Sequence, residues 1–274
     1  RIRIRYHGVF RDGIAVDNVR LYGNKPLNTA FKFTSGTPLA VFTDALATIP
    51  YNSATMTATT VYIKPTLTQL ENASFTITAN ATLSSGCIAT KNVVVTNNSK
   101  IWSGAATNWN TAASWKPVGV PTATNCVIVV NNSTISGTSF EAYGRNLNVK
   151  STGNLTVNAT NTLTVTEAVK VDTGGNFILE STSSLVQINN TTNTGNIKAR
   201  VNTKPMRRFD YTYWSTPVAS QMLGTLSPLT LADKYYSWNT TTQSWLLHAS
   251  GNISMTNAKG YIAVSYTHLR AHET

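Results

Sequence analysis

Short triplets between residues 147 and 187 decide the fold of this chain. The first set is Leu147-Asn148-Val149, Leu155-Thr156-Val157 and Leu163-Thr164-Val165. The second set keeps the same order: Val169-Lys170-Val171, Phe177-Ile178-Leu179 and Leu185-Val186-Gln187. The offset between the sets is constant, because 169 − 147, 177 − 155 and 185 − 163 all equal 22. A fixed period of this size indicates a repeat architecture, and it outranks local propensity.

Each triplet places its first and third side chains on one face, as a short strand does. Three short strands in every period predict a parallel β-solenoid. The repeat predicts stacked interior pairs, namely Leu147 on Val169, Leu155 on Phe177 and Leu163 on Leu185. Turns at Gly153 and at Gly174-Gly175 fall at equivalent corners. An earlier coil around Val127-Ile128-Val129 fits the period loosely, and an antiparallel meander of hairpins stays open as the alternative.

Three tryptophans precede the repeat, at Trp102, Trp109 and Trp115. Flat aromatic rings pack on sugar faces, so these residues are candidate ligand-binding residues. The alternative is a cap that covers the first apolar layer of the solenoid, which an elongated β stack needs at its end. The sequence favours the cap. We assign residues 99–200 to a solenoid-like repeat domain with this tryptophan-rich cap.

Residues 24–98 contain short strands separated by glycine and proline turns, the pattern of an Ig-like β-sandwich. The paired cysteines and core tryptophan of antibody domains are absent, because Cys87 is the only cysteine in this stretch and no tryptophan precedes Trp102. The segment resembles bacterial Ig-like spacer modules instead. Since Cys87 and Cys126 fall in different predicted domains, we expect two unpaired, buried thiols.

Residues 1–23 contain two strand patterns around a turn at Arg11-Asp12-Gly13. They resemble the closing hairpin of a jelly-roll module of the MAM or carbohydrate-binding type, here truncated. In that resemblance Asp17 matches a residue that helps to bind a structural calcium ion. One carboxylate is not a site for an ion that takes six to eight oxygens, so an ordinary strand-end aspartate is favoured. We expect no other cofactor and no metal site.

Residues 201–263 lose the repeat and gain aromatic residues, so we expect an incomplete β module there. Asp210, Tyr211, Tyr213 and Trp214 form the best candidate binding cluster, since an acceptor beside aromatic rings suits sugars or peptides. The alternative is an interdomain seam in which buried tyrosine hydroxyls and Asp210 satisfy each other, with Arg207 or Arg208 as ion-pair partner. The seam is favoured. Residues 264–274 look like a translated sequencing adapter, and we exclude them as non-biological.

Composition narrows the function. Charged residues make up 12% of the chain, about half of the usual share of roughly 25%, which disfavours most enzymes. The net charge is +11, but the basic residues are scattered, so we expect no nucleic-acid partner. No apolar run is long enough for a membrane span. Glu141, Glu167 and Glu180 could approach one another across coils, and a pectinase-like β-helix enzyme would need such a cluster on one face. Because Glu167 and Glu180 lie in turn-like positions, where an acid is usually solvated, we expect no catalytic residues and no enzyme activity.

The succession of motifs resembles a known class of protein. It runs from Trp102-Ser103-Gly104 through Ser184-Leu185-Val186-Gln187 to R-F-D-Y-T-Y-W-S-T-P-V at 208–218 and Leu226-Ser227-Pro228. Over roughly residues 65–263 it looks like the large, adhesin-like secreted surface proteins of Flavobacterium-type Bacteroidetes. That resemblance implies an extracellular, modular context and export by the type IX secretion system. It supplies no catalytic residues.

Together these observations predict an all-β chain: an Ig-like sandwich, a short parallel β-solenoid and an incomplete aromatic-rich β module. The expected function is that of a non-catalytic structural or adhesive segment of an extracellular bacterial surface protein. Its expected partners are glycans or other cell-surface polymers. The alternative is a carbohydrate-binding or spacer region attached to a secreted hydrolase.

Overall fold

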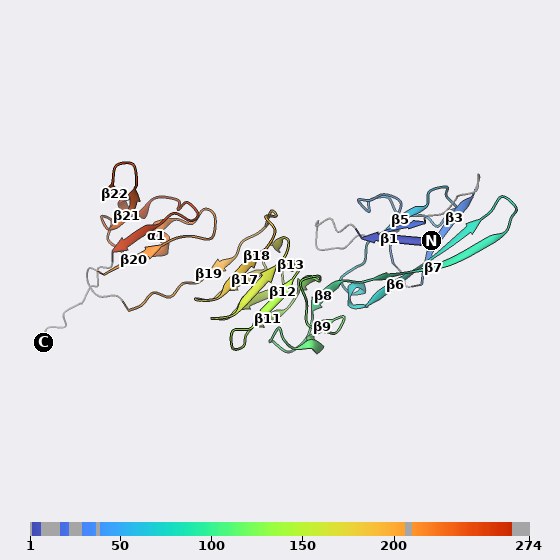
Figure 1. Cartoon of the computed structure of the whole chain (residues 1–274), viewed down its shortest axis with the longest axis horizontal. Helices are drawn as coiled ribbons and strands as arrows, with labels where there is room; N and C mark the ends of the chain where they lie inside the picture. The colour runs from blue at the N-terminus through green and yellow to red at the C-terminus, as the bar shows by residue number, and fades with distance from the viewer. Residues whose placement is uncertain (1, 7–16, 22–28, 37–38, 206–209, 265–274) are drawn as a thin grey trace. The chain divides into compact units, whose positions relative to one another are not determined.

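The computed structural model describes residues 2–6, 17–21, 29–36, 39–205 and 210–264. The chain is almost all β, with 42% strand and 6% helix. It forms two compact units, Arg1–Lys198 and Ala199–Thr274 (Figure 1). The division lies close to the boundary predicted at residue 200, and the short strand β19 (Lys198–Ala199) spans it.

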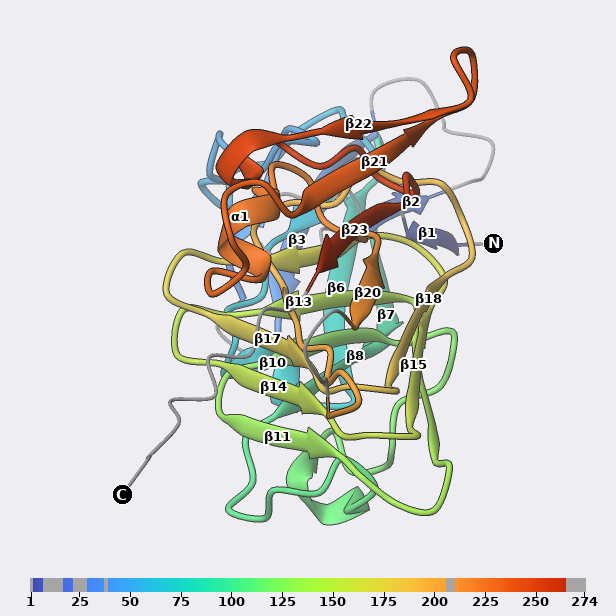
Figure 2. The same ribbon diagram turned by 90° about the vertical axis from the view of Figure 1, so that its left-hand side faces the viewer.

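The repeat region is a parallel β-solenoid of about 3 turns. Each coil contributes one strand to each of three parallel stacks, which Figure 2 shows side by side. The first stack consists of β10 (Cys126–Val129), β13 (Asn146–Val149) and β16 (Val169–Val171). The second consists of β11 (Asn132–Ile135), β14 (Asn154–Val157) and β17 (Asn176–Leu179). The third consists of β12 (Glu141–Gly144), β15 (Thr162–Val165) and β18 (Ser184–Gln187).

The predicted stacking is confirmed residue by residue. The paired positions are Leu147 with Val169, Leu155 with Phe177 and Leu163 with Leu185. All pairings in these stacks are parallel, so the antiparallel meander is excluded for this region. Side chains at these positions form one continuous buried cluster because each coil lies directly on the next.

The first coil fits the period loosely because its strands are spaced differently. Val127 pairs with Leu147, Ser133 with Leu155 and Ala142 with Leu163. These offsets are 147 − 127 = 20, 155 − 133 = 22 and 163 − 142 = 21. The strand order is kept, but the first corner is shorter (133 − 127 = 6 against 155 − 147 = 8) and the second is longer (142 − 133 = 9 against 163 − 155 = 8), so a search at a fixed offset of 22 recovers only part of this coil.

The corners of the coils bring backbone close to backbone. A Cβ at Gly153 would lie 2.3 Å from the carbonyl oxygen of Val129, and one at Gly175 would lie 2.6 Å from that of Lys150. Such distances are far inside van der Waals contact. Glycine is therefore required at these equivalent corners, which explains why the two residues recur 175 − 153 = 22 positions apart.

Two antiparallel sheets lie at the N-terminal side of the solenoid. One has the order β1-β2-β5-β4, and its strands are β1 (Ile2–Tyr6), β2 (Asp17–Leu21), β5 (Thr60–Ile63) and β4 (Val41–Phe42). The other has the order β3-β6-β7, and its strands are β3 (Ala30–Ser35), β6 (Ser74–Thr82) and β7 (Ile88–Thr96). A 3₁₀ turn, η1 (Gln69–Glu71), precedes β6. Residues from both sheets share one core, while the Ig-like assignment stays a prediction.

The N-terminal hairpin differs from the predicted domain boundary. Strands β1 and β2 pair as expected, but β2 also pairs with β5, with Asp17 opposite Ile63. The hairpin therefore completes one sheet of the neighbouring sandwich rather than standing as a separate module ending at residue 23. The side chain of Asp17, on which the calcium expectation depends, lies outside what the structure describes.

One sheet separates the sandwich core from the solenoid core. Strand β8 (Ser99–Trp102) pairs with β10 in parallel. Ile101 and Ile128 belong to the sandwich core, while the alternating residues Trp102 and Val129 belong to the solenoid core. Because opposite faces of the same two strands serve both cores, the two parts are fused through a shared wall.

The C-terminal unit is a four-stranded antiparallel sheet in the order β20-β23-β21-β22. Its strands are β20 (Tyr211–Trp214), β21 (Tyr235–Asn239), β22 (Ser244–Leu247) and β23 (Tyr261–Val264). A short helix, α1 (Leu223–Leu226), and a 3₁₀ turn, η3 (Ala249–Gly251), complete it. Val264, the first residue of the segment that we attribute to an adapter, pairs with Tyr211. The rest of that segment lies outside the described residues.

Candidate functional site

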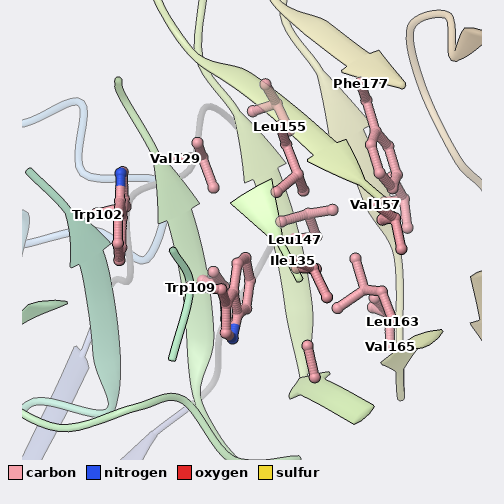
Figure 3. Packing of buried hydrophobic residues seen from close by; sticks show 14 of the residues in the cluster. Trp102, Trp109, Val129, Ile135, Leu147, Leu155, Val157, Leu163, Val165 and Phe177 are labelled. Carbon is pink, nitrogen blue, oxygen red and sulfur yellow. The ribbon is translucent and has the colours of Figure 1, made fainter. Parts of the chain in front are cut away.

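The three predicted tryptophans lie inside the start of the solenoid. Trp102, Trp109 and Trp115 are each 0% exposed. Figure 3 shows Trp102 and Trp109 among the buried residues of this cluster. Their rings meet edge to face, with centroids 5.0 Å apart for Trp102 and Trp115 and 4.6 Å apart for Trp109 and Trp115. Trp115 also lies on β9 (Trp115–Lys116), which pairs with β8 after the 3₁₀ turn η2 (Ala112–Ser114). A ring without exposed surface offers no face to a sugar, so burial supports the cap rather than ligand binding.

The interior side chains of the first coil are small, which leaves room for the rings of the tryptophan cap. Ser133, Ala142 and Gly144 occupy positions that hold Leu155, Leu163 and Val165 in the next coil. The indole rings belong to the same buried cluster and occupy space that larger side chains fill further along. A Cβ at Gly144 would lie only 2.9 Å from Cγ2 of Val127. The N-terminal end of the solenoid is therefore closed by packing.

A polar residue closes the other end. Gln187 follows Gly144 and Val165 in the same interior column. Its Nε2 donates to the carbonyl oxygen of Glu167 at 2.9 Å, and its Oε1 accepts from Nδ2 of Asn193 at 2.7 Å. Oδ1 of Asn193 in turn accepts from the backbone N–H of Val169 at 2.8 Å. These amides satisfy backbone groups that a further coil would otherwise pair.

The predicted cluster at residues 210–214 is divided between two faces of a sheet. Tyr211 and Tyr213 are 55% and 67% exposed, so they are not the buried pair that a seam requires. Trp214 lies on the opposite face, half-buried against the core around Leu223. Asp210 is exposed just before the strand. Arg207 and Arg208, its proposed partners, lie outside the described residues.

Strand register shows which residues join Tyr211 and Tyr213. Tyr213 pairs with Ile262, Ile262 with Tyr236, and Tyr236 with Leu247. Two positions along the same strands, Trp238 pairs with Trp245. Directly paired residues share a face of the sheet, as do residues two apart. We call this surface the aromatic face: Tyr211, Tyr213, Tyr236, Trp238, Trp245, Leu247 and Ile262.

The other side of the sheet holds the core of the unit. Tyr235, Tyr261 and Ala263 alternate with the aromatic face and pack with Leu223 of α1 and with Met255. On the aromatic face, Trp238 and Trp245 are 41% and 50% exposed, whereas Ile262 is 7% exposed.

Ring contacts organise the aromatic face into two pairs. The ring centroids of Tyr211 and Tyr213 are 5.5 Å apart at an interplanar angle of 86°. Those of Trp238 and Trp245 are 5.1 Å apart at 72°. Such edge-to-face pairs hold aromatic side chains in place. The charge interaction with Tyr211, together with desolvation and a hydrogen bond, raises the pKa of Tyr213 above its ordinary value.

The surroundings of the tryptophan pair are polar and uncharged. The β21–β22 turn consists of residues 240–243, Thr-Thr-Thr-Gln. Oδ1 of Asn239 accepts from the N–H of Thr241 at 3.0 Å, and the hydroxyls of Thr242 and Ser244 lie 2.8 Å apart. None of the residues of the aromatic face is charged. The surface therefore offers apolar rings bordered by hydroxyl and amide groups.

Other reactive groups are engaged in structural contacts. The Tyr143 hydroxyl donates to the Glu141 carboxylate, and Oε1 of Glu167 accepts from Asn189 at 3.3 Å. Oγ of Ser237 and Nε2 of His248 lie 2.8 Å apart. Within the described residues, no group of three or more His, Cys, Asp or Glu side chains could hold a metal ion. Cys87 and Cys126 are both free thiols, as predicted, but the expected burial is wrong, because Cys87 is exposed and Cys126 is only partly buried.

Asp172 forms the clearest ion-pair network of the solenoid. Its carboxylate oxygens lie 3.1 Å from Nζ of Lys150 and 3.2 Å from Nζ of Lys170, on adjacent coils. Desolvation raises the pKa of this carboxyl, but hydrogen bonds and charge interactions with the two lysines outweigh it and lower the pKa below its ordinary value. The network links the coils across their outer surface.

These features define an all-β protein built on a capped parallel β-solenoid with a separate β module. The chain belongs to the family described as "Domain of unknown function (DUF8693)", whose model matches residues 101–274. The match covers the solenoid and the C-terminal unit. No curated protein and no solved structure matches the chain significantly. In the described part of the chain, no helix is both long and apolar enough to span a membrane.

Proposed function

We propose that the chain is a non-catalytic structural and adhesive segment of an extracellular bacterial surface protein. The observation that carries the proposal is a solenoid closed at both ends, by buried tryptophans at one and by Gln187 and Asn193 at the other. Every coil is hydrogen-bonded to its neighbours, which makes such a stack stiff along its axis. A stiff, closed module suits a spacer that holds other modules away from a cell.

The fusion with the sandwich supports the same function. Because Ile101 and Ile128 enter the sandwich core from the wall of the solenoid, no flexible linker separates the two parts. A load applied to one part passes directly to the other. The resemblance to adhesin-like surface proteins of Flavobacterium-type Bacteroidetes adds the extracellular setting and type IX export to the proposal.

Labelling of intact cells tests the location. Antibodies raised against residues 99–198 should label the producing bacterium without permeabilisation, and external protease should remove the label. Labelling that requires permeabilised cells contradicts the proposal. A periplasmic protein of the same strain serves as the control for cell integrity, because it should remain unlabelled in intact cells.

The second candidate is a carbohydrate-binding or spacer region attached to a secreted hydrolase. The aromatic face of the C-terminal unit favours it, since exposed rings on one sheet face suit sugar binding. The sequence of the complete gene separates the two candidates. A hydrolase domain in the same reading frame supports the second candidate, and an array of further β modules supports the first.

A further inference from the structure

We propose that the aromatic face of the C-terminal unit binds an uncharged polysaccharide. The inference deepens the adhesive part of the proposed function and rests on it. The face gathers Tyr211, Tyr213, Tyr236, Trp238 and Trp245 on one side of the sheet, opposite the core of the unit. An uncovered surface of this composition marks a place of interaction.

The charge of the surface selects the partner. The residues of the aromatic face carry no charge, and the turn beside Trp238 and Trp245 carries hydroxyl and amide groups only. Beside the face, Nζ of Lys234 lies 2.7 Å from Oδ2 of Asp233, and Asp210 is exposed directly before Tyr211. A charged polymer would gain no ion pair from the residues of the face and would lose hydration there. The matching ligand is uncharged, with apolar ring faces and many hydroxyls, which is the chemistry of a neutral polysaccharide.

The geometry suits a chain more than a single sugar. The two ring pairs lie on different strands, Tyr211 with Tyr213 on β20 and Trp238 with Trp245 on the β21–β22 hairpin. Tyr236 and the well-buried Ile262 lie between them, because the register runs Tyr213, Ile262, Tyr236 across the sheet. A ligand that contacts both pairs must therefore cross several strands, as an extended polymer does.

A protein partner fits the surface less well. Interfaces between proteins favour arginine beside tryptophan and tyrosine at their centres, and no arginine lies among the face residues. A second copy of the chain would place the same uncharged face against itself. Both possibilities give distinct outcomes in the test below.

Native affinity electrophoresis of the 274-residue chain tests the inference. The probes are three uncharged polysaccharides, galactomannan, xyloglucan and hydroxyethylcellulose, with anionic alginate for comparison. We expect at least one uncharged probe to retard the chain and alginate to have no effect. Tyr213→Ala, Trp238→Ala and Trp245→Ala should each weaken retardation about tenfold or more, the scale of a central aromatic contact. Trp238→Phe should keep most of it.

Controls separate binding from folding and from self-association. Tyr143→Ala removes a partly exposed aromatic residue of the solenoid, which is not a member of the aromatic face, and should leave retardation unchanged. Circular dichroism should show the face variants folded. Absence of retardation in every gel, retardation by alginate alone, or retardation that all three substitutions leave intact overturns the inference. So does a dimer in size-exclusion chromatography that Trp238→Ala converts to monomer. Surface labelling of cells is read independently, so failure of one proposal is distinguishable from failure of the other.

Discussion

Replacing Leu155 with alanine removes a side chain from the middle of an interior column. Leu155 is 0% exposed and lies between Ser133 and Phe177 on the neighbouring coils. Leucine-to-alanine changes in cores cost about 2–5 kcal/mol, depending on how well the site can collapse. Here both neighbours are held in register by parallel hydrogen bonds, and Ser133 is too small to fill the space. We therefore expect a loss of about 3–4 kcal/mol.

Differential scanning calorimetry of the full chain measures this effect. A loss of that size lowers the melting temperature of a unit this large by roughly 10 °C. Thr156→Ala is the matched control, because Thr156 lies next along β14 on the outward face, and it should change stability by less than about 0.5 kcal/mol. Equal, small shifts for both variants would refute the stacked interior.

Three further predictions concern single groups. The pKa of Asp172 is lowered, so the folded protein binds this proton less tightly than the unfolded chain does. The stabilisation by Asp172 should therefore be complete above about pH 4 and should decline as pH falls through the folded pKa. In acid melting curves, Asp172→Asn should remove this decline. Thr182 has a φ of 70°, which is strained for a β-branched residue. Thr182→Gly should therefore raise the free energy of unfolding, measured in urea, by about 1 kcal/mol. A lower free energy of unfolding would contradict this prediction. Desolvation and the nearby charge of Lys259 lower the pKa of His248. The C-terminal unit should therefore lose stability as pH falls below about 6.5 toward the folded pKa. His248→Gln should make the melting temperature, followed by fluorescence, nearly independent of pH between pH 5 and 7.

The solenoid could be predicted because its determinants are local and repeated. A column of like side chains needs matching residues at a fixed offset, and Leu155 and Phe177 carry that signal in the sequence. The first coil was harder because Val127 lies 20 rather than 22 positions before its partner. The position of Gln187 at the end of an interior column is predictable from the sequence, since a polar residue occupies a position where the repeat requires an apolar one.

Long-range pairing could not be predicted. Strand β2 pairs with β5, which begins only at Thr60, and nothing in residues 1–23 specifies that partner. The tryptophans at 102–115 fit two interpretations in the sequence, and only their burial distinguishes them.

The candidate site was recognised in part. The density of aromatic residues near Tyr211 was visible, and strand alternation alone would have placed Trp214 on the opposite face. The contribution of Trp238 and Trp245 to the same face depends on β20 and β21 both pairing with β23. That pairing joins distant segments of the chain, so the local sequence pattern does not predict it.

Nuclear Overhauser contacts between coils test the central claim most directly. In a chain with methyl-labelled leucine and valine, the Leu155 methyl groups should show strong cross-peaks to the Phe177 ring. The Leu147 methyls should likewise contact Val169, and those of Leu163 should contact Leu185. Absence of these cross-peaks in the folded chain, with Leu155 instead contacting residues of an adjacent antiparallel strand, would contradict a solenoid of stacked coils.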